Sequence, residues 1–227
     1  MFKTWPYLIP DDIGLYAIQL PGHGRRLAEP PLDELGSIVK QLGAVLTEFS
    51  DLPLVFFGHS MGALMAFETA RELRRIARIQ PELLFVAGYH APQVGHRPRS
   101  IHDLPEAEFI QKIRDLEGTP AEILDDSQAL GIILPPLRAD FKIVDTYRYQ
   151  LDLPLRCPIT AFSGANDSHF EQGAIDAWRF QTTGAFSMHI LAGGHFFIHE
   201  SECELLELIV ADLSQILTGS LGAKESL

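Results

Sequence analysis

Cysteine is scarce in this chain of 227 residues, which contains only Cys157 and Cys203. Two cysteines cannot form a disulfide framework, and without a Cys-x-x-Cys pair the sequence has no zinc motif of that kind. Long apolar runs are also missing, so no 18-residue segment is suited to cross a membrane. Residues 1–6 lack the apolar stretch of a signal peptide. These absences predict a cytoplasmic protein with no membrane partner.

Basic residues are the next shortage, with 18 Lys and Arg against 30 Asp and Glu and a net charge of −12. The shortage is uneven, because residues 1–80 carry 8 basic and 9 acidic side chains and residues 81–227 carry 10 and 21. Such an excess of negative charge repels nucleic-acid phosphates. We therefore expect no nucleic-acid partner.

One cluster of basic side chains stands out, and its members fall on one face of a predicted helix: Arg71, Arg74, Arg75 and Arg78. This spacing has two interpretations. The stripe is either a contact surface for an acidic partner or a solvated helix face balanced in part by Glu68 and Glu72.

What is present is an ordinary globular composition, with 46% hydrophobic and 21% charged residues. The length fits one domain over residues 1–227, which we expect to be a monomer. Short apolar runs alternate with helical patterns, which is typical of a parallel α/β sheet with helices on both faces. The expected strands are residues 14–20, 54–57, 83–88, 159–163 and 186–191.

Helical spacing of apolar residues predicts helices over residues 32–49, 61–76, 174–181 and 204–217. The polar tail after them, residues 218–227, is expected to be frayed.

Residues 91–152 interrupt this alternation, because they contain no convincing strand and only helical pieces at residues 106–117 and 137–149. About 60 residues is far longer than a usual crossover between parallel strands. We expect a helical lid over the binding site, with an enlarged structural crossover as the alternative.

The segment most informative for function is a Gly-x-Ser-x-Gly pattern at Gly58, Ser60 and Gly62, which directly follows an apolar strand and precedes a helix. In this context the pattern predicts a sharp turn that raises the serine above the sheet, with both glycines permitting the turn and close packing. A serine hydroxyl needs a base to remove its proton. Ser60 is therefore the candidate nucleophile.

The base is expected downstream, because this turn belongs with the chain order serine, acid, histidine. His195 follows the end of the last predicted strand, after Gly193 and Gly194, which let the loop pass close to neighbouring backbone. His199 is the second choice, and His189 lies inside the strand as a packing or surface residue. His195 is the candidate base.

The acid is expected at the carboxyl end of a strand between nucleophile and base. Asp167 occupies that position, in the turn after residues 159–163. Asp152 precedes its strand, and Asp140 and Asp145 lie on a helix of the predicted lid. Asp167 would hold the histidine in the right tautomer and stabilise its charged form.

No cofactor or metal is indicated. Residues 22–27 resemble a Gly-x-Gly-x-x-Gly loop, but Leu27 occupies the third glycine position. No P-loop lysine motif is present, and the nine histidines lack metal-ligand spacing.

The sequence as a whole resembles the type II thioesterases, stand-alone α/β-hydrolases that serve polyketide synthases and nonribosomal peptide synthetases. Five segments carry the resemblance over almost the whole chain: Gln19-Leu20-Pro21-Gly22, Arg26-Leu27-Ala28-Glu29-Pro30-Pro31, Phe57-Gly58-His59-Ser60-Met61-Gly62-Ala63, Leu137-Arg138-Ala139-Asp140-Phe141 and Gly193-Gly194-His195-Phe196-Phe197.

This resemblance implies a Ser60, His195, Asp167 triad, with the Met61 N–H in the oxyanion hole. It implies hydrolysis of acyl groups from the phosphopantetheine thiol of acyl or peptidyl carrier proteins, as an editing step. Three alternatives remain: a medium-chain fatty acyl thioesterase, an esterase for small oxygen esters, and an inactive relative that keeps the carrier-docking surface.

One departure from the family pattern concerns the N-terminus. Family members begin with a short strand and a Pro-x-Ala-Gly-Gly-like loop, and only then match Phe2-Lys3-Thr4-Trp5 of this chain. Relative to that pattern the strand and a second oxyanion donor are missing. We therefore expect a gap of about 9–10 Å in the sheet beside residues 54–57, with a poor or inactive enzyme as one consequence.

The last expectation concerns the acyl chain, which an apolar tunnel in the lid would hold. Its expected lining is Phe109, Ile113, Ile132, Ile133, Leu134, Phe141 and Val144. Burial contributes only about 0.8 kcal/mol per methylene, so a broad chain-length preference follows.

Overall fold

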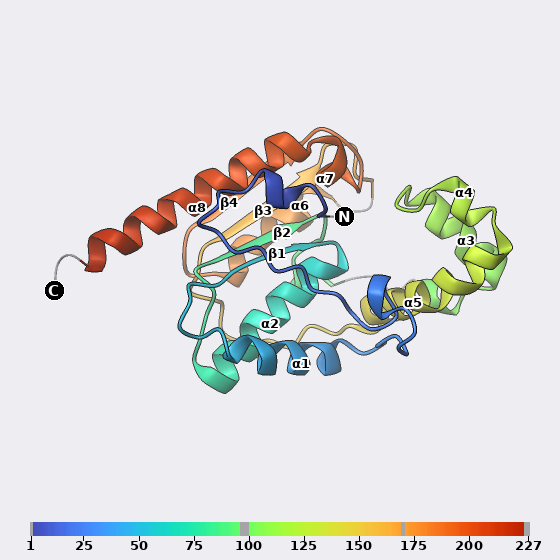
Figure 1. The fold of residues 1–227 in the computed structure, drawn as a ribbon, viewed down its shortest axis with the longest axis horizontal. Coiled ribbons are helices and arrows are strands. Elements are labelled where there is room, and N and C mark those ends of the chain that lie inside the picture. The colour runs from blue at the N-terminus through green and yellow to red at the C-terminus, as the bar shows by residue number, and fades with distance from the viewer. Residues whose placement is uncertain (1, 96–99, 169–170, 225–227) are drawn as a thin grey trace.

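A four-stranded parallel sheet organises the chain in a computed structural model, which describes residues 2–95, 100–168 and 171–224 (Figure 1). Its strands lie side by side in chain order: β1 (Val55–His59), β2 (Leu83–Ala87), β3 (Ile159–Gly164) and β4 (Phe186–Leu191). The predicted α/β class is confirmed, and these four strands lie within two residues of their predicted bounds. All their carboxyl ends therefore meet at one edge of the sheet.

Helices cover both faces of the sheet, because successive side chains of β2 pack alternately into two different hydrophobic cores. Leu84 and Val86 belong to the core that includes residues of α1 (Leu35–Thr47) and α2 (Met61–Ala77). Leu83, Phe85 and Ala87 point into the opposite core, against α8 (Glu202–Lys224). Figure 1 shows α8 on one side of the sheet and α1 with α2 on the other.

The remaining elements after β3 are short. The predicted helix over residues 174–181 is split into α6 (Gln172–Asp176) and the 3-10 helix η5 (Ala177–Gln181), and α7 (Phe197–Glu200) follows β4. The expectation of a frayed tail from residue 218 is wrong for residues 218–224, which continue α8. No proline interrupts them, and a helix that has nucleated adds one hydrogen bond for each further residue. Residues 225–227 lie outside the described residues.

The strand predicted over residues 14–20 is wrong. These residues are irregular, with Tyr16 71% and Ile18 56% exposed. A strand needs a hydrogen-bonding neighbour, and within the described residues β1 pairs only with β2. Within the described residues β1 is therefore an edge strand, and the expected 9–10 Å gap between two strands does not arise because residues 14–20 form none.

The start of the chain packs differently, through aromatic side chains. The 3-10 helix η1 (Trp5–Tyr7) places the Trp5 ring 4.8 Å from that of Phe57, and the indole is almost fully buried. Phe2 adds edge-on contacts to both rings. The 3-10 helix η1 therefore covers β1 on the side of the sheet that faces α8.

The segment between β2 and β3 is helical, as predicted. It comprises two 3-10 helices, η3 (Pro92–Val94) and η4 (Ile101–Asp103), and three α-helices, α3 (Glu106–Asp115), α4 (Ala121–Leu124) and α5 (Ser127–Thr146). Among its described residues none is in a strand. Figure 1 shows α3 and α4 to one side of the sheet, with α5 running back toward α1 and α2.

The arginine stripe on α2 is mostly committed to contacts within the chain. Arg71 and Arg75 form ion pairs with Glu68 and Glu72, as the solvated-face interpretation predicts. Arg71 is nevertheless buried, and with Arg74 it binds backbone carbonyls of residues 150–154. These two arginines therefore fasten the chain that leads into β3.

Among the helices of the described residues, none combines the length and the apolar character that a membrane span requires.

Candidate active site

Ser60 occupies the one-residue turn between β1 and α2, as the Gly-x-Ser-x-Gly pattern predicts. Its backbone has φ 54° and ψ −122°, a conformation that a non-glycine residue rarely adopts. The Ser60 N–H donates to the carbonyl of Ala87 at the end of β2, at 2.8 Å. The turn thus lifts the hydroxyl above the carboxyl edge of the sheet at the start of α2.

The two glycines of the motif differ in what they permit. A Cβ on Gly58 would lie 2.0 Å from the carbonyl oxygen of Gly62, so only glycine allows the end of β1 to meet the first turn of α2. A Cβ on Gly62 would meet no atom within 4 Å. The expectation that both glycines are needed for close packing is therefore supported at Gly58 and not at Gly62.

The three residues predicted as a triad lie together. His195 Nδ1 is 2.8 Å from Asp167 Oδ2, and its Nε2 is 3.1 Å from Ser60 Oγ. A carboxylate can only accept, so Nδ1 carries the proton and donates it, and Nε2 presents a lone pair to the serine hydroxyl. The side chains of Asp167 and His195 are 0% and 7% exposed. This is the arrangement in which imidazole can remove the Ser60 proton.

Close backbone contacts bring the acid and the base together. A Cβ on Gly164, the last residue of β3, would lie 2.2 Å from the carbonyl oxygen of Gly194. The Asn166 N–H donates to the Gly193 carbonyl at 2.9 Å, and Gly193 has φ +112°. The turn that carries Asp167 and the loop that precedes the histidine therefore interlock.

The alternative bases lie elsewhere. His189 stays within β4 and stacks on Phe162, with ring centroids 5.5 Å apart. His199 lies in α7 and stacks on Phe196. Among the described residues, His195 is the histidine within hydrogen-bond distance of the serine hydroxyl.

The alternative acids are engaged with other partners. Asp152 forms an ion pair with Arg74, at 2.7 Å. Asp140 pairs with His23, and Asp145 pairs with His102. All three carboxylates therefore serve contacts that hold helices and loops, which agrees with the choice of Asp167.

Sequence reasoning gave no role to His59, the last residue of β1. Its Nε2 lies 2.8 Å from the backbone oxygen of His195, and burial lowers its pKa to about 4. Its place next to the nucleophile was the only available signal, and a sequence does not tell toward which neighbour such a side chain points.

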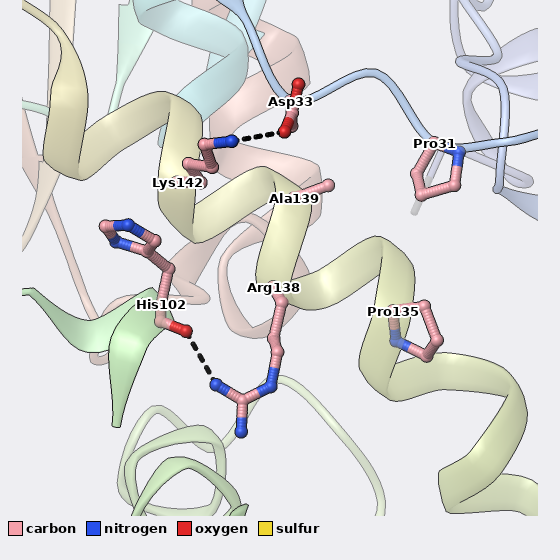
Figure 2. A pocket seen from close by; sticks show the side chains of 7 residues that line it. All are labelled: Pro31, Asp33, His102, Pro135, Arg138, Ala139 and Lys142. Atoms are coloured by element: carbon pink, nitrogen blue, oxygen red, sulfur yellow. Dashed lines mark hydrogen bonds and ion pairs between the residues drawn. The ribbon is translucent and has the colours of Figure 1, made fainter. Parts of the chain in front are cut away.

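Two hollows flank α5, and neither is lined by a triad residue. The larger, about 360 Å³, is lined by Pro31, Asp33, His102, Pro135, Arg138, Ala139 and Lys142. Figure 2 shows Lys142 paired with Asp33 and Arg138 donating to the carbonyl of His102. The smaller, about 210 Å³, lies between Gly22–Leu27 and the opposite face of α5. Asp33 thus neutralises the charge of Lys142, whereas the Arg138 guanidinium donates to backbone carbonyls.

The side chains predicted to line an acyl tunnel have separate locations. Phe109, Ile113 and Leu134 fill a small core of the helical segment, each at most 7% exposed. Ile132 is 51% exposed, and Val144 packs against the main core. Of the seven side chains predicted to line the tunnel, only Ile133 lines one of these two hollows, the smaller one.

The described residues were also compared with the side-chain clusters of metal sites and the loops of dinucleotide sites. Across the described ranges, no three His, Cys, Asp or Glu side chains gather as metal ligands do. Residues 22–27 follow irregular chain rather than a strand and include only the short 3-10 helix η2 (Gly24–Arg26). That context differs from the strand–loop–helix of a dinucleotide site.

Comparison with known sequences places this fold and site in a family. A family model described as the thioesterase domain matches residues 1–213. The gramicidin S biosynthesis protein GrsT of Aneurinibacillus migulanus is 42% identical over 216 residues, which cover 95% of this chain and 84% of GrsT.

Solved structures agree with this placement. RedJ, a thioesterase from the prodiginine biosynthetic pathway in Streptomyces coelicolor, matches with a TM-score of 0.85 at 36% identity, over 92% of this chain and 79% of RedJ. YbtT, a type II thioesterase from the yersiniabactin NRPS/PKS pathway, matches with a TM-score of 0.79 at 29% identity, over 88% and 81%. The chain therefore belongs to the thioesterase domain family and is a hydrolytic enzyme with the α/β-hydrolase fold.

Proposed function

We propose that this thioesterase releases acyl groups from the phosphopantetheine thiol of carrier proteins in a polyketide or nonribosomal peptide pathway. The observation that carries the proposal is the Ser60, His195, Asp167 relay on a chain 42% identical to a gramicidin S biosynthesis protein. RedJ and YbtT, which come from the prodiginine and yersiniabactin biosynthetic pathways, favour the same class of partner. Removal of misprimed or stalled acyl units is the editing role that such an enzyme would fill.

In the first half of the reaction, Ser60 Oγ attacks the thioester carbonyl while His195 Nε2 takes its proton. The 3.1 Å separation of these two atoms suits that transfer. Negative charge develops on the carbonyl oxygen, and the Met61 N–H at the start of α2 is one donor placed to stabilise it. The carbon–sulfur bond then breaks, and the thiol leaves with the proton from the imidazolium.

In the second half, water replaces the thiol. The water oxygen attacks the acyl-serine carbonyl while His195 Nε2 accepts a proton from the water. The Ser60 oxygen then leaves and regains the proton, which frees the carboxylic acid. Throughout, Asp167 keeps the ring in the tautomer with the proton on Nδ1 and stabilises the imidazolium in each half-reaction.

The chain works as one domain in this proposal, with residues 91–152 as a helical lid over the acyl site. The small core around Phe109 and Leu134 supports this role, because it packs α3, α4 and the first part of α5 against one another, while Ile143 anchors the end of α5 in the main core. An apolar enclosure discriminates weakly between chain lengths, which suits an editing enzyme.

Covalent labelling combined with a substrate panel tests the proposal. A fluorophosphonate should label Ser60 in the wild type and leave the Ser60→Ala variant unlabelled. The thioester of an acyl-loaded carrier protein should be hydrolysed faster than a small oxygen ester with the same acyl group. An unlabelled wild type would indicate an inactive relative, and preference for the free ester would indicate a carboxylesterase.

A second function has a specific observation in its favour. The medium-chain S-acyl fatty acid synthase thioesterase of Rattus norvegicus is 31% identical over 210 residues, covering 89% of this chain and 78% of that protein. A second panel, with acyl groups of different length on the same carrier protein, separates the two, because a fatty acyl thioesterase would favour medium-chain acyl groups over short or branched ones.

A further inference from the structure

His59 lies where three elements of the active site converge. It ends β1, directly before the nucleophile, and its side chain is buried. Its ring centroid is 5.0 Å from that of His195 and 5.4 Å from that of Phe196. A Cβ on Gly88, just after β2, would lie 2.9 Å from His59 Nε2, so the ring occupies space that this glycine leaves open.

The hydrogen bond made by this ring has a defined direction. Nε2 lies 2.8 Å from the backbone oxygen of His195, and a carbonyl oxygen can only accept. Burial, followed by the nearby charge of His195, lowers the pKa of His59 to about 4, so the ring is neutral at ordinary pH. His59 therefore carries its one proton on Nε2 and donates it to the carbonyl.

This bond adds a further contact to the loop before the base. The Gly193 carbonyl of that loop accepts from the Asn166 N–H, and the Gly194 N–H donates to Glu200. Asp167 holds the ring of His195 at Nδ1. His59 holds the backbone at the carbonyl oxygen, which anchors the other end of the same residue.

We propose that His59 is a positioning residue, which fixes the backbone of the base relative to the nucleophile through one hydrogen bond and one peptide linkage. Ser60 follows His59 in the chain, so movement of the base loop against the nucleophile would have to stretch or break this bond. The inference rests on the proposed function, because it assumes that Ser60 and His195 react together.

Two polar variants that differ in reach test the inference. The amide nitrogen of His59→Gln can occupy the position of Nε2, whereas that of His59→Asn is one methylene shorter and cannot reach the carbonyl. A misplacement of about 1 Å can cost roughly 10²-fold in rate. For hydrolysis of an acyl-loaded carrier protein, we expect kcat to fall on the order of 10²-fold in His59→Asn. In His59→Gln, kcat should stay within about fivefold of wild type. KM should change little in both variants.

A proton resonance gives a readout that a merely structural role would not move. The hydrogen bond between His195 Nδ1 and Asp167 should give a far-downfield proton signal, which should shift or broaden in His59→Asn and persist in His59→Gln. Melting temperatures of both variants show whether they are folded equally well.

The outcomes separate this inference from the proposed function. If wild type is unlabelled by fluorophosphonate, the proposed function fails and the inference fails with it. If wild type is labelled while both variants match its kcat and its downfield signal, only the role of His59 is wrong. Equal loss of kcat in the two variants would likewise overturn it, because the effect would then not depend on reaching the carbonyl.

Discussion

The loops that carry the triad and the helical segment of residues 101–146 are held in different ways. At the edge of the sheet, backbone meets backbone so closely that Gly58 and Gly164 have no room for a methyl group. The helical segment instead meets the N-terminal loop through ion pairs, between His23 and Asp140 and between Asp33 and Lys142. Backbone contact in a packed interior fixes position, whereas partly exposed ion pairs contribute little and break readily.

This difference assigns the two regions different tasks. The reacting atoms need fixed distances, which the interlocked loops provide. In the proposed function, acyl groups of different length need an enclosure that adjusts. The small core of α3, α4 and the first part of α5 suits that need, while Ile143 anchors the end of α5 in the main core. Variants that break one kind of contact or the other test this difference.

The largest effect is expected at the triad itself. Replacing His195 by alanine removes the base and should lower kcat on the order of 10⁶-fold, by analogy with serine proteases. Asp167→Asn should cost less, roughly 10⁴-fold, because the acid only orients and stabilises the base. Steady-state hydrolysis of acyl-carrier protein measures both. The matched control is Asp145→Asn, and the assignment is wrong if that variant loses activity while Asp167→Asn does not.

The next effect compares two glycines of the same motif. Gly58→Ala places a methyl group 2.0 Å from a carbonyl oxygen and should lower the free energy of unfolding by about 3 kcal/mol. Gly62→Ala meets no atom within 4 Å and should leave the protein as stable or up to about 1 kcal/mol more stable, because alanine favours helix. Urea unfolding of the pair measures the contrast. Similar losses in both would show that backbone contact does not govern this turn.

Buried and partly exposed histidines should give opposite pH dependences of stability. Burial lowers the pKa of His59 from 6.5 to about 4, so the unfolded state binds the proton first as the pH falls. Relative to His59→Gln, wild type should lose about 2 kcal/mol of unfolding free energy between pH 8 and pH 5. Unfolding curves at several pH values measure it. A pH-independent difference would contradict the burial of a neutral ring.

His23 provides the counterpart in the other region. Its hydrogen bond to Asp140 raises its pKa, so the folded state binds the proton more tightly than the unfolded state does. Relative to His23→Gln, wild type should be stabilised below pH 6.5 and should lose that advantage as the pH rises through the raised pKa. The same unfolding series serves as the measurement, and a difference of the opposite sign would show that His23 is not paired.

The smallest effect is expected at the most exposed link. Lys142 and Asp33 form an ion pair with about half of each side chain exposed. Lys142→Ala should change the unfolding free energy by no more than about 1 kcal/mol. Its effect on kcat should be small compared with any triad variant. A loss of activity comparable to that of Asp167→Asn would mean that this pair fixes the reacting atoms after all.

The regions also differ in how far the sequence predicts them. Strands with both faces covered have a clear apolar signature, and the Gly-x-Ser-x-Gly motif in its strand–helix context identifies the turn that Ser60 occupies. Chain order and strand ends then single out His195 and Asp167. These signals are local, so a single sequence suffices to read them.

What the sequence could not predict depends on contacts with distant residues. Residues 14–20 have a strand-like pattern but no neighbour to pair with in the described structure, so they stay irregular. Phe109 and Leu134 pack in a local core of the helical segment. The apolar pattern of a sequence is the same for such a core as for the lining of a tunnel. The direction in which the His59 side chain points depends on Gly88, far away in sequence.

The central claim is that Ser60 releases the acyl group from the carrier protein, and the intact mass of that protein tests it most directly. Acyl-carrier protein is incubated with wild type or with Ser60→Ala at equal concentration. The account predicts that wild type returns the carrier protein to its free-thiol mass while Ser60→Ala leaves the acyl mass in place. Release by Ser60→Ala at the wild-type rate would contradict the account.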